Sequence, residues 1–240
     1  MIEFINVSKH YKGQAAPAID TLNLTIAQGD FFGLLGPNGS GKTTLFSMLA
    51  GLLKPSKGQI RINQCPATQQ KKVIGFVPQH IALYPHLTVK ENIQYFASLY
   101  GLTGKTLTSQ VNQVIQFTKL EKYTDLSLSK CSGGIQRRAN IAAGIVHQPQ
   151  LLLLDEPTAH IDPYSRNIIF DALLSLHQQG TTLIYTSHYL EEVAKLCNPI
   201  AILDTGKVLA HGSCQEVIKQ SHADNLGDAF LELTGKQQSC

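Results

Sequence analysis

The residues with the most recognisable chemistry form a glycine-rich loop, Gly36-Pro37-Asn38-Gly39-Ser40-Gly41-Lys42-Thr43. This loop matches G-x-x-x-x-G-K-[ST], follows a short apolar run and opens a helix-forming segment. The glycines let successive backbone N–H groups face inward around an anion, and a helix N-terminus adds a favourable dipole for phosphate. We expect Lys42 to reach the β- and γ-phosphates of a nucleotide and Thr43 to bind Mg²⁺. The alternative is a glycine-rich turn that binds nothing, and the flanking strand and helix argue against it.

A second group of reactive side chains, Asp155 and Glu156, ends a run of four leucines. Ligands of open α/β sheets bind beyond the carboxyl ends of the strands, so both carboxylates are expected to face the phosphate site. Asp155 would hold Mg²⁺, directly or through water, and Glu156 would polarise the attacking water as general base. A cap of a turn or helix is the alternative role for an isolated Asp-Glu-Pro.

The stretch Cys131-Ser132-Gly133-Gly134-Ile135-Gln136-Arg137-Arg138 lies between these two groups. Together the three motifs resemble those of the ATP-binding cassette (ABC) ATPases, and the resemblance covers nearly the whole chain. It implies a subunit that binds and hydrolyses ATP with Mg²⁺. The usual signature of that family is Leu-Ser-Gly-Gly-Gln, so Cys131 and Ile135 depart from it. The remaining Ser-Gly-Gly can still offer a hydroxyl, N–H groups and a helix N-terminus to a γ-phosphate.

The resemblance also implies roles for isolated residues. Tyr11 would stack on adenine, Gln79 would sense Mg²⁺ and the γ-phosphate, His188 would contact the γ-phosphate, and Asp162 would couple the two sites of a dimer. Each has a structural alternative: a strand-edge tyrosine, a polar loop residue, a structural histidine and a helix N-cap. The expected nucleotide-binding set is Tyr11, Gly36, Pro37, Asn38, Gly39, Ser40, Gly41, Lys42, Thr43, Thr44, Ser132, Gly133 and Gly134; the catalytic set is Glu156, His188 and Gln79; the metal set is Thr43, Gln79 and Asp155.

Residues 185–193 and 226–235 are similar to the switch region and C-terminal helix of one branch, the ATPases of ABC-2-type exporters. The apolar Ile135 fits the same branch. This resemblance implies a two-fold dimer, with itself or a paralogous cassette, that drives a separate integral-membrane permease. No direct nucleic-acid partner is expected, and the protein would lie in the cytoplasm, peripheral at the inner face of the cell membrane through its permease. We expect residues 79–100 to form the permease-docking surface.

The alternative function is a soluble ABC-type ATPase that acts on nucleic acid or ribosomes. Relatives in translation usually carry two cassettes, and this chain has one phosphate loop. Chromosome-maintenance relatives insert long coiled coils between phosphate loop and signature, whereas Lys42 and Ser132 are separated here by only 132 − 42 = 90 positions.

Composition fits a globular chain: 240 residues, 43% hydrophobic and 15% charged, with a net charge of +3. No apolar run approaches the ~20 residues that span a bilayer, and no signal peptide is visible. The five scattered cysteines contain no C-x-x-C, which argues for free thiols rather than a disulfide framework or zinc site.

The elements that must position these motifs alternate between strand and helix. Strands are expected near residues 2–7, 22–26, 31–35, 58–62, 73–77, 151–155, 181–186, 199–204 and 208–210, and helices near 43–52, 162–178, 189–196 and 226–235. Between the strands near 73–77 and 151–155, a further helix face is indicated by the i, i+3, i+4 and i+7 spacing of Val111, Val114, Ile115 and Thr118. The expected fold is an α/β P-loop NTPase core with a mixed, largely parallel sheet, an N-terminal antiparallel β-subdomain and a helical signature subdomain. The expected domains are residues 1–88 with 149–215, the helical subdomain 89–148, and a C-terminal helical segment 216–240.

Overall fold

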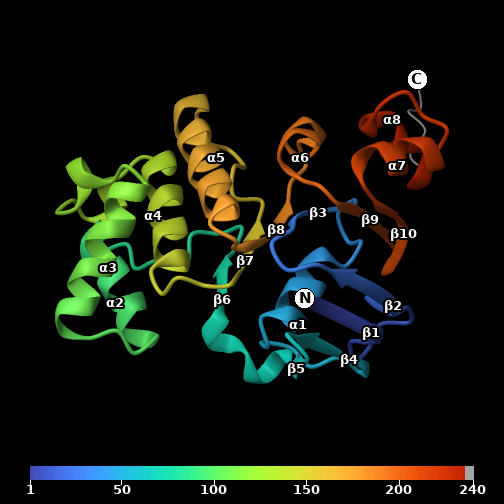
Figure 1. The fold of residues 1–240 in the computed structure, drawn as a ribbon, viewed down its shortest axis with the longest axis horizontal. Coiled ribbons are helices and arrows are strands. Elements are labelled where there is room, and N and C mark those ends of the chain that lie inside the picture. The colour runs from blue at the N-terminus through green and yellow to red at the C-terminus, as the bar shows by residue number, and fades with distance from the viewer. Residues whose placement is uncertain (236–240) are drawn as a thin grey trace. The chain divides into compact units, whose positions relative to one another are not determined.

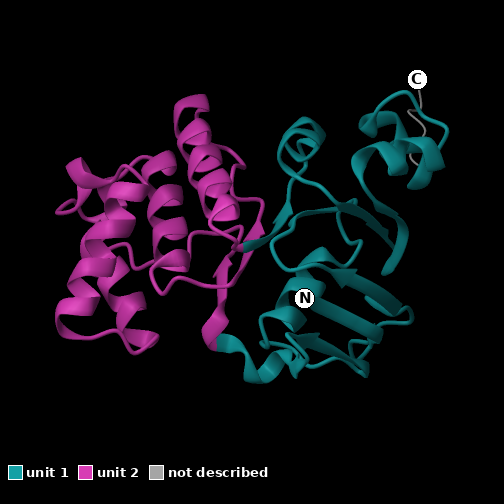
Figure 2. Cartoon of the chain, viewed as in Figure 1, with its two compact units in different colours: residues 1–71, 182–240 teal, residues 72–181 magenta. Residues whose placement is uncertain are grey.

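The computed structural model describes residues 1–235. The chain divides into two compact units, residues 1–71 with 182–240 and residues 72–181 (Figure 2). The division expected from the sequence, with boundaries at residues 88, 148 and 215, stays a prediction. The last part of the expected C-terminal segment, residues 236–240, lies outside the described residues.

The N-terminal part of the first unit is an antiparallel sheet with the strand order β2-β1-β4-β5 (Figure 1). Its strands are β1 (Ile2–Lys9), β2 (Ile19–Ile26), β4 (Lys57–Ile62) and β5 (Cys65–Pro66). In β2 the apolar residues are buried, whereas Thr21, Asn23 and Thr25 are exposed, as expected for a sheet with one face toward a core. The N-terminal antiparallel β-subdomain is therefore present.

The same unit contains a second set of strands that is largely parallel. These are β3 (Phe31–Leu35), β8 (Thr182–Thr186), β9 (Ile200–Asp204) and β10 (Lys207–Gly212). Strand β3 pairs in parallel with β8 and β9, and β10 pairs antiparallel to β9. All residues of β3 and β8 are buried. Because the two strands are parallel, the segments after Leu35 and Thr186 leave the sheet at the same edge.

The described part of the first unit also contains the helices α1 (Lys42–Leu49), α6 (Leu190–Leu196), α7 (Cys214–Gln220) and α8 (Leu226–Leu233). A short 3-10 helix covers Ala67–Gln69. Helix α8 packs on α6 and α7. Helix α1 begins at Lys42, directly after the phosphate loop.

The second unit pairs two strands with a group of helices. Strands β6 (Ile74–Val77) and β7 (Leu151–Asp155) are parallel, and Val77 lies beside Leu154. The helices are α2 (Val89–Leu99), α3 (Gly104–Phe117), α4 (Gly133–Ile145) and α5 (Pro163–Gln178), with 3-10 helices at Lys71–Val73, Glu121–Tyr123 and Leu128–Lys130. Helix α4 is largely buried and packs on α2, α3, α5 and β6.

Local details of this unit agree with the sequence prediction. Val111, Val114 and Ile115 form the buried face of α3. Helix α5 begins with Pro163 after the N-cap Asp162, whose side chain accepts a hydrogen bond from the Ser165 N–H. The α/β class, the antiparallel and largely parallel strands and the helical signature region are thus confirmed. Within residues 1–235, no helix combines the length and apolarity needed to cross a bilayer.

Candidate functional site

The phosphate loop joins β3 to α1 in the first unit, and its glycines are required by its geometry. A Cβ at Gly36 would collide with the carbonyl oxygen of Leu203 and with the Ser40 side chain. Gly41, the N-cap of α1, has φ +109°, and a Cβ there would lie 2.6 Å from the carbonyl oxygen of Ala18. Gly36 and Gly41 therefore let the loop pack closely against neighbouring backbone. A glycine-rich loop of this kind can turn successive N–H groups toward an anion.

The Lys42 ammonium is held against this loop. Its Nζ donates to the carbonyl oxygens of Gly36, at 2.7 Å, and Pro37, at 3.1 Å, and the residue is buried. Burial of an ammonium is costly unless it is hydrogen-bonded, and these carbonyls supply the partners. The first unit thus presents a cation and a helix N-terminus within one loop.

Tyr11 lies next to the start of α1. Its hydroxyl is 3.3 Å from Thr44 Oγ1, and either oxygen could be the donor. The Lys9 ammonium lies 5.6 Å from the centre of the Tyr11 ring, within the range of a cation–π contact. Two residues of the expected nucleotide set, Tyr11 and Thr44, are therefore neighbours, and the tyrosine remains partly exposed.

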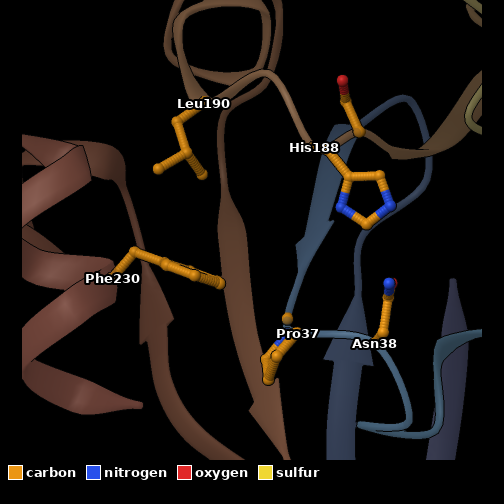
Figure 3. Close-up of a pocket in the computed structure, with 7 residues that line it drawn as sticks. Pro37, Asn38, His188, Leu190 and Phe230 are labelled. Atoms are coloured by element: carbon orange, nitrogen blue, oxygen red, sulfur yellow. The ribbon is translucent and has the colours of Figure 1, made fainter. Parts of the chain in front are cut away.

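His188 lies in a cavity of about 210 Å³ in the first unit. The cavity is lined by Gly36, Pro37, Asn38, Ser187, His188, Leu190 and Phe230. Figure 3 shows the His188 ring directed toward Asn38, with Leu190 and Phe230 across the cavity. The structure thus brings the expected switch histidine to the phosphate loop, as the parallel pairing of β3 and β8 requires.

In the second unit, the ends of β6 and β7 bring Gln79 and Glu156 together. Gln79 Nε2 donates to Glu156 Oε2 at 2.9 Å. Asp155 and Glu156 are both buried, and Glu156 has φ +48°, a left-handed conformation that is uncommon outside glycine. Buried carboxylates at a strand end need polar partners, and the Gln79 amide is one of them.

Arg137 on α4 belongs to the same cluster, and no motif in the sequence predicts a role for it. Its guanidinium donates to the carbonyl oxygens of Pro78, at 3.1 Å, and Gln79, at 2.6 Å. Burial lowers the pKa of Arg137, and the negative charges of Glu156 and Asp155 raise it. A buried guanidinium therefore lies within electrostatic range of the two carboxylates.

Asn140, one turn further along α4, also holds the Gln79 loop. Its Oδ1 accepts from the Ala82 N–H at 3.3 Å and its Nδ2 donates to the Pro78 carbonyl at 3.4 Å. The only signal for these two residues in the sequence is their i, i+3 spacing on one helix face. That spacing does not identify their partners, which lie 58 to 62 residues away in the chain.

The signature forms the N-terminus of α4, and its two glycines have different surroundings. Ser132 is the N-cap and its Oγ accepts from the Ile135 N–H at 3.5 Å. A Cβ at Gly133 would meet open space. A Cβ at Gly134 would collide with the Ser165 Oγ and lie 2.7 Å from Asp162 Oδ2. Gly133 thus leaves the helix start accessible, whereas Gly134 allows α4 to pack on the start of α5.

These groups suit nucleotide chemistry. The phosphate loop of the first unit offers N–H groups, an ammonium and the Thr43 hydroxyl, and the second unit offers the oxygens of Gln79 and Asp155. Oxygen atoms are the ligands that Mg²⁺ prefers. Among residues 1–235, no cluster of three or more His, Cys, Asp or Glu side chains is arranged to hold a metal ion. The oxygen donors fit the usual mode in which Mg²⁺ is held by few protein ligands plus nucleotide phosphates.

Comparison with known proteins agrees with this chemistry. A family model described as ABC transporter matches residues 19–159. The linearmycin resistance ATP-binding protein LnrL of Bacillus subtilis is 38% identical over 238 residues, covering 98% of this chain and 75% of that protein. The Nod factor export ATP-binding protein I of Bradyrhizobium sp. is 33% identical over 237 residues, covering 98% of this chain and 76% of that protein.

A solved structure has the same fold. It is an ATP-binding cassette in a dimeric, post-hydrolysis state with ADP and Pi bound. It superposes with a TM-score of 0.81 at 28% identity and covers 89% of this chain and 98% of that one.

Proposed function

Because this chain belongs to the ABC transporter family and is an ATP-hydrolysing cassette of that family, we propose that it powers an exporter whose permease is a separate chain. The observation that supports the ATPase part is the phosphate loop, in which the buried Lys42 ammonium donates hydrogen bonds to the carbonyl oxygens of Gly36 and Pro37 directly before α1. The export part is supported by two relatives whose names refer to resistance and export.

The residues of the first unit bind the nucleotide in this proposal. The loop N–H groups and Lys42 hold the phosphates, Tyr11 lies against adenine, and His188 contacts the γ-phosphate. The Thr43 hydroxyl and the Asp155 carboxylate would hold Mg²⁺, and Gln79 would offer a further oxygen ligand. Bound Mg²⁺ supplies charge neutralisation for the phosphates.

The residues of the second unit act on water and on the partner subunit. Glu156 accepts the proton of the attacking water, and Gln79 fixes the orientation of its carboxylate through their hydrogen bond. Ser132 and Gly133 bind the γ-phosphate held by the other subunit of a two-fold dimer. A dimeric relative supports this arrangement. Dimer closure on ATP and opening after hydrolysis would then drive the permease.

The permease would dock on residues 79–100, which holds the protein at the inner face of the cell membrane. In this segment Leu83 is buried, whereas Tyr84 is 48% exposed and Tyr95 39% exposed. The two tyrosine rings pack edge-to-face with centroids 5.1 Å apart. Asn92 Nδ2 donates to the Tyr84 carbonyl at 3.0 Å, which fixes the loop on α2. Exposed, fixed aromatic side chains are typical of interfaces.

Mixed dimers test the proposed composite site. Lys42→Ala and Ser132→Arg should each abolish ATPase activity alone, with Lys57→Ala on β4 as the control of equal charge change. In a mixed dimer one site combines both lesions and the other is intact, so partial activity should return. Normal activity of Ser132→Arg would show that the signature does not act across a dimer, and normal activity of Lys42→Ala would contradict the ATPase assignment itself.

A further inference from the structure

Glu192 is a buried carboxylate on α6 that the expected chemistry does not use. It is 6% exposed, and its Oε2 accepts hydrogen bonds from the Tyr185 hydroxyl at 2.7 Å and the Ser187 hydroxyl at 3.1 Å. The Ser187 Oγ in turn accepts from the Tyr189 N–H at 3.0 Å. This chain of bonds fixes the residues on both sides of His188.

The network is rigid for physical reasons. Both hydroxyls donate to the same oxygen of Glu192, and Tyr185 is fully buried. Loss of the carboxylate would remove one hydrogen-bond partner from each of two buried hydroxyls, which is costly. The end of β8 and the start of α6 are therefore connected through side chains as well as through the backbone.

The other side of His188 faces the cavity beside the phosphate loop. Leu190 and Phe230 form an apolar wall there, opposite Asn38 (Figure 3). Helix α8 approaches this wall closely, because a Cβ at Gly227 would lie 4.0 Å from Leu190 Cδ1. The backbone at residue 188 is thus held by the Glu192 network and directs its imidazole toward the loop.

We propose that Glu192 is a positioning residue for His188 and acts through the Ser187 hydroxyl. The inference rests on the proposed contact between His188 and the γ-phosphate. Glu192 touches neither nucleotide nor water in this scheme. Its effect is to hold the imidazole in the geometry that the transition state requires, and a misplacement of about 1 Å can cost ~10²-fold in rate.

The test is a double-mutant cycle on the full chain, with kcat and the KM for ATP measured for each variant. His188→Ala should lower kcat by roughly 10²–10³, the usual loss of one charge-stabilising donor. Glu192→Ala should lower kcat by roughly 10- to 100-fold with KM within about twofold of normal. The double variant should match His188→Ala, since positioning has no effect once the positioned group is gone.

Matched variants separate positioning from folding. Glu191→Ala removes the neighbouring, exposed carboxylate and should leave kcat unchanged, while Glu192→Gln can still accept both bonds and should retain most activity. Tyr185→Phe and Ser187→Ala remove single hydroxyls, and each should reproduce part of the loss even if Glu192→Ala does not fold. Losses that multiply with His188→Ala would overturn the positioning inference but leave the ATPase intact. A normal kcat for His188→Ala would instead remove the proposed role of His188, and the inference with it.

Discussion

The Gln79 side chain is hydrogen-bonded directly to Glu156, with 2.9 Å between Nε2 and Oε2. The two side chains follow neighbouring parallel strands. Their hydrogen bond therefore connects the segment after β6 with the segment after β7. Arg137 from α4 holds the carbonyl oxygen of the same Gln79 at 2.6 Å. One amide-bearing residue therefore connects the expected base with the helix that begins at the signature.

Replacement of Glu156 by glutamine should stop hydrolysis and preserve ATP binding. The amide oxygen can still accept the Gln79 bond, so the loop should keep its place, but the side chain cannot accept a proton. Loss of a general base typically costs ~10²–10⁴ in rate. Single-turnover ATPase assays and ATP-dependent dimerisation on a sizing column measure both effects, with the exposed Glu121→Gln as control. Near-normal turnover would move the base role to another residue.

Arg137 and Arg138 are adjacent but should have different functions. Arg137 bonds the Gln79 loop, whereas Arg138 donates to the carbonyl oxygens of Thr118 and Lys119. Arg137→Ala should lower kcat by roughly tenfold or more because the Gln79 loop loses its anchor. Arg138→Ala should mainly lower the melting temperature, since it leaves two carbonyls without this partner. Steady-state kinetics and thermal melts of the two variants, compared side by side, distinguish these effects. Equal kinetic losses in both would contradict the assignment.

The signature glycines should also separate stability from turnover. Gly134→Ala collides with Ser165, so the free energy of unfolding should fall by roughly 1–3 kcal/mol. Ser165→Gly should partly restore it, because it removes the colliding side chain. Gly133→Ala meets open space and should keep or raise stability, yet lower ATPase activity by obstructing close approach of a phosphate. Denaturant melts measure the stability changes and ATPase assays measure the activity changes. Full activity in Gly133→Ala would exclude phosphate contact at that residue.

Replacement of the exposed tyrosines of residues 79–100 by charged residues should uncouple transport from ATP hydrolysis. Tyr84→Glu and Tyr95→Glu place carboxylates on the expected docking surface and should reduce copurification with the permease while basal ATPase activity is preserved. Leu126→Glu, at a residue of similar exposure outside the segment, is the control. If the tyrosine variants assemble and transport normally, docking occurs elsewhere.

Stability should fall in mild acid because of His147. Its ring stacks on Tyr100 with centroids 3.5 Å apart, and burial lowers its pKa to about 4, opposed by a hydrogen bond to the Ile74 carbonyl. The unfolded histidine titrates near 6.5, so between these values the unfolded state binds more protons. Stability is therefore present above pH 6.5 and is lost as pH falls toward 4, by at most about 1.4 kcal/mol per pH unit.

The measurement is a series of denaturant melts across that pH range. Carboxylates such as Glu91, whose pKa is lowered by hydrogen bonds from Thr88, add their own acid sensitivity. The diagnostic quantity is therefore the difference in slope between wild type and His147→Gln. His222→Gln, at an exposed histidine, is the control, and an unchanged slope in His147→Gln would refute the prediction.

The sequence predicted what local signals encode. Strand β7 and helix α5 appear at the expected residues because four consecutive leucines and an Asp-Pro cap are unambiguous. The roles of Arg137 and Glu192 could not be predicted, since their partners are defined by packing. Nor could sequence distinguish Gly133 from Gly134, whose difference arises from Ser165 on another helix.

The roles of the expected site residues stay predictions. The structure places His188 at the phosphate loop and Gln79 against Glu156.

The anchoring of Pro78 and Gln79 by Arg137 and Asn140 has a thermodynamic consequence. Coupling free energy is reciprocal. A ligand that binds the start of α4 and stabilises that helix also stabilises the hydrogen-bonded arrangement of the Gln79 loop. A ligand that stabilises the loop stabilises the helix by the same free energy. A nucleotide that binds the start of α4 and a permease that binds the Gln79 loop would therefore strengthen one another's binding, without any contact between them.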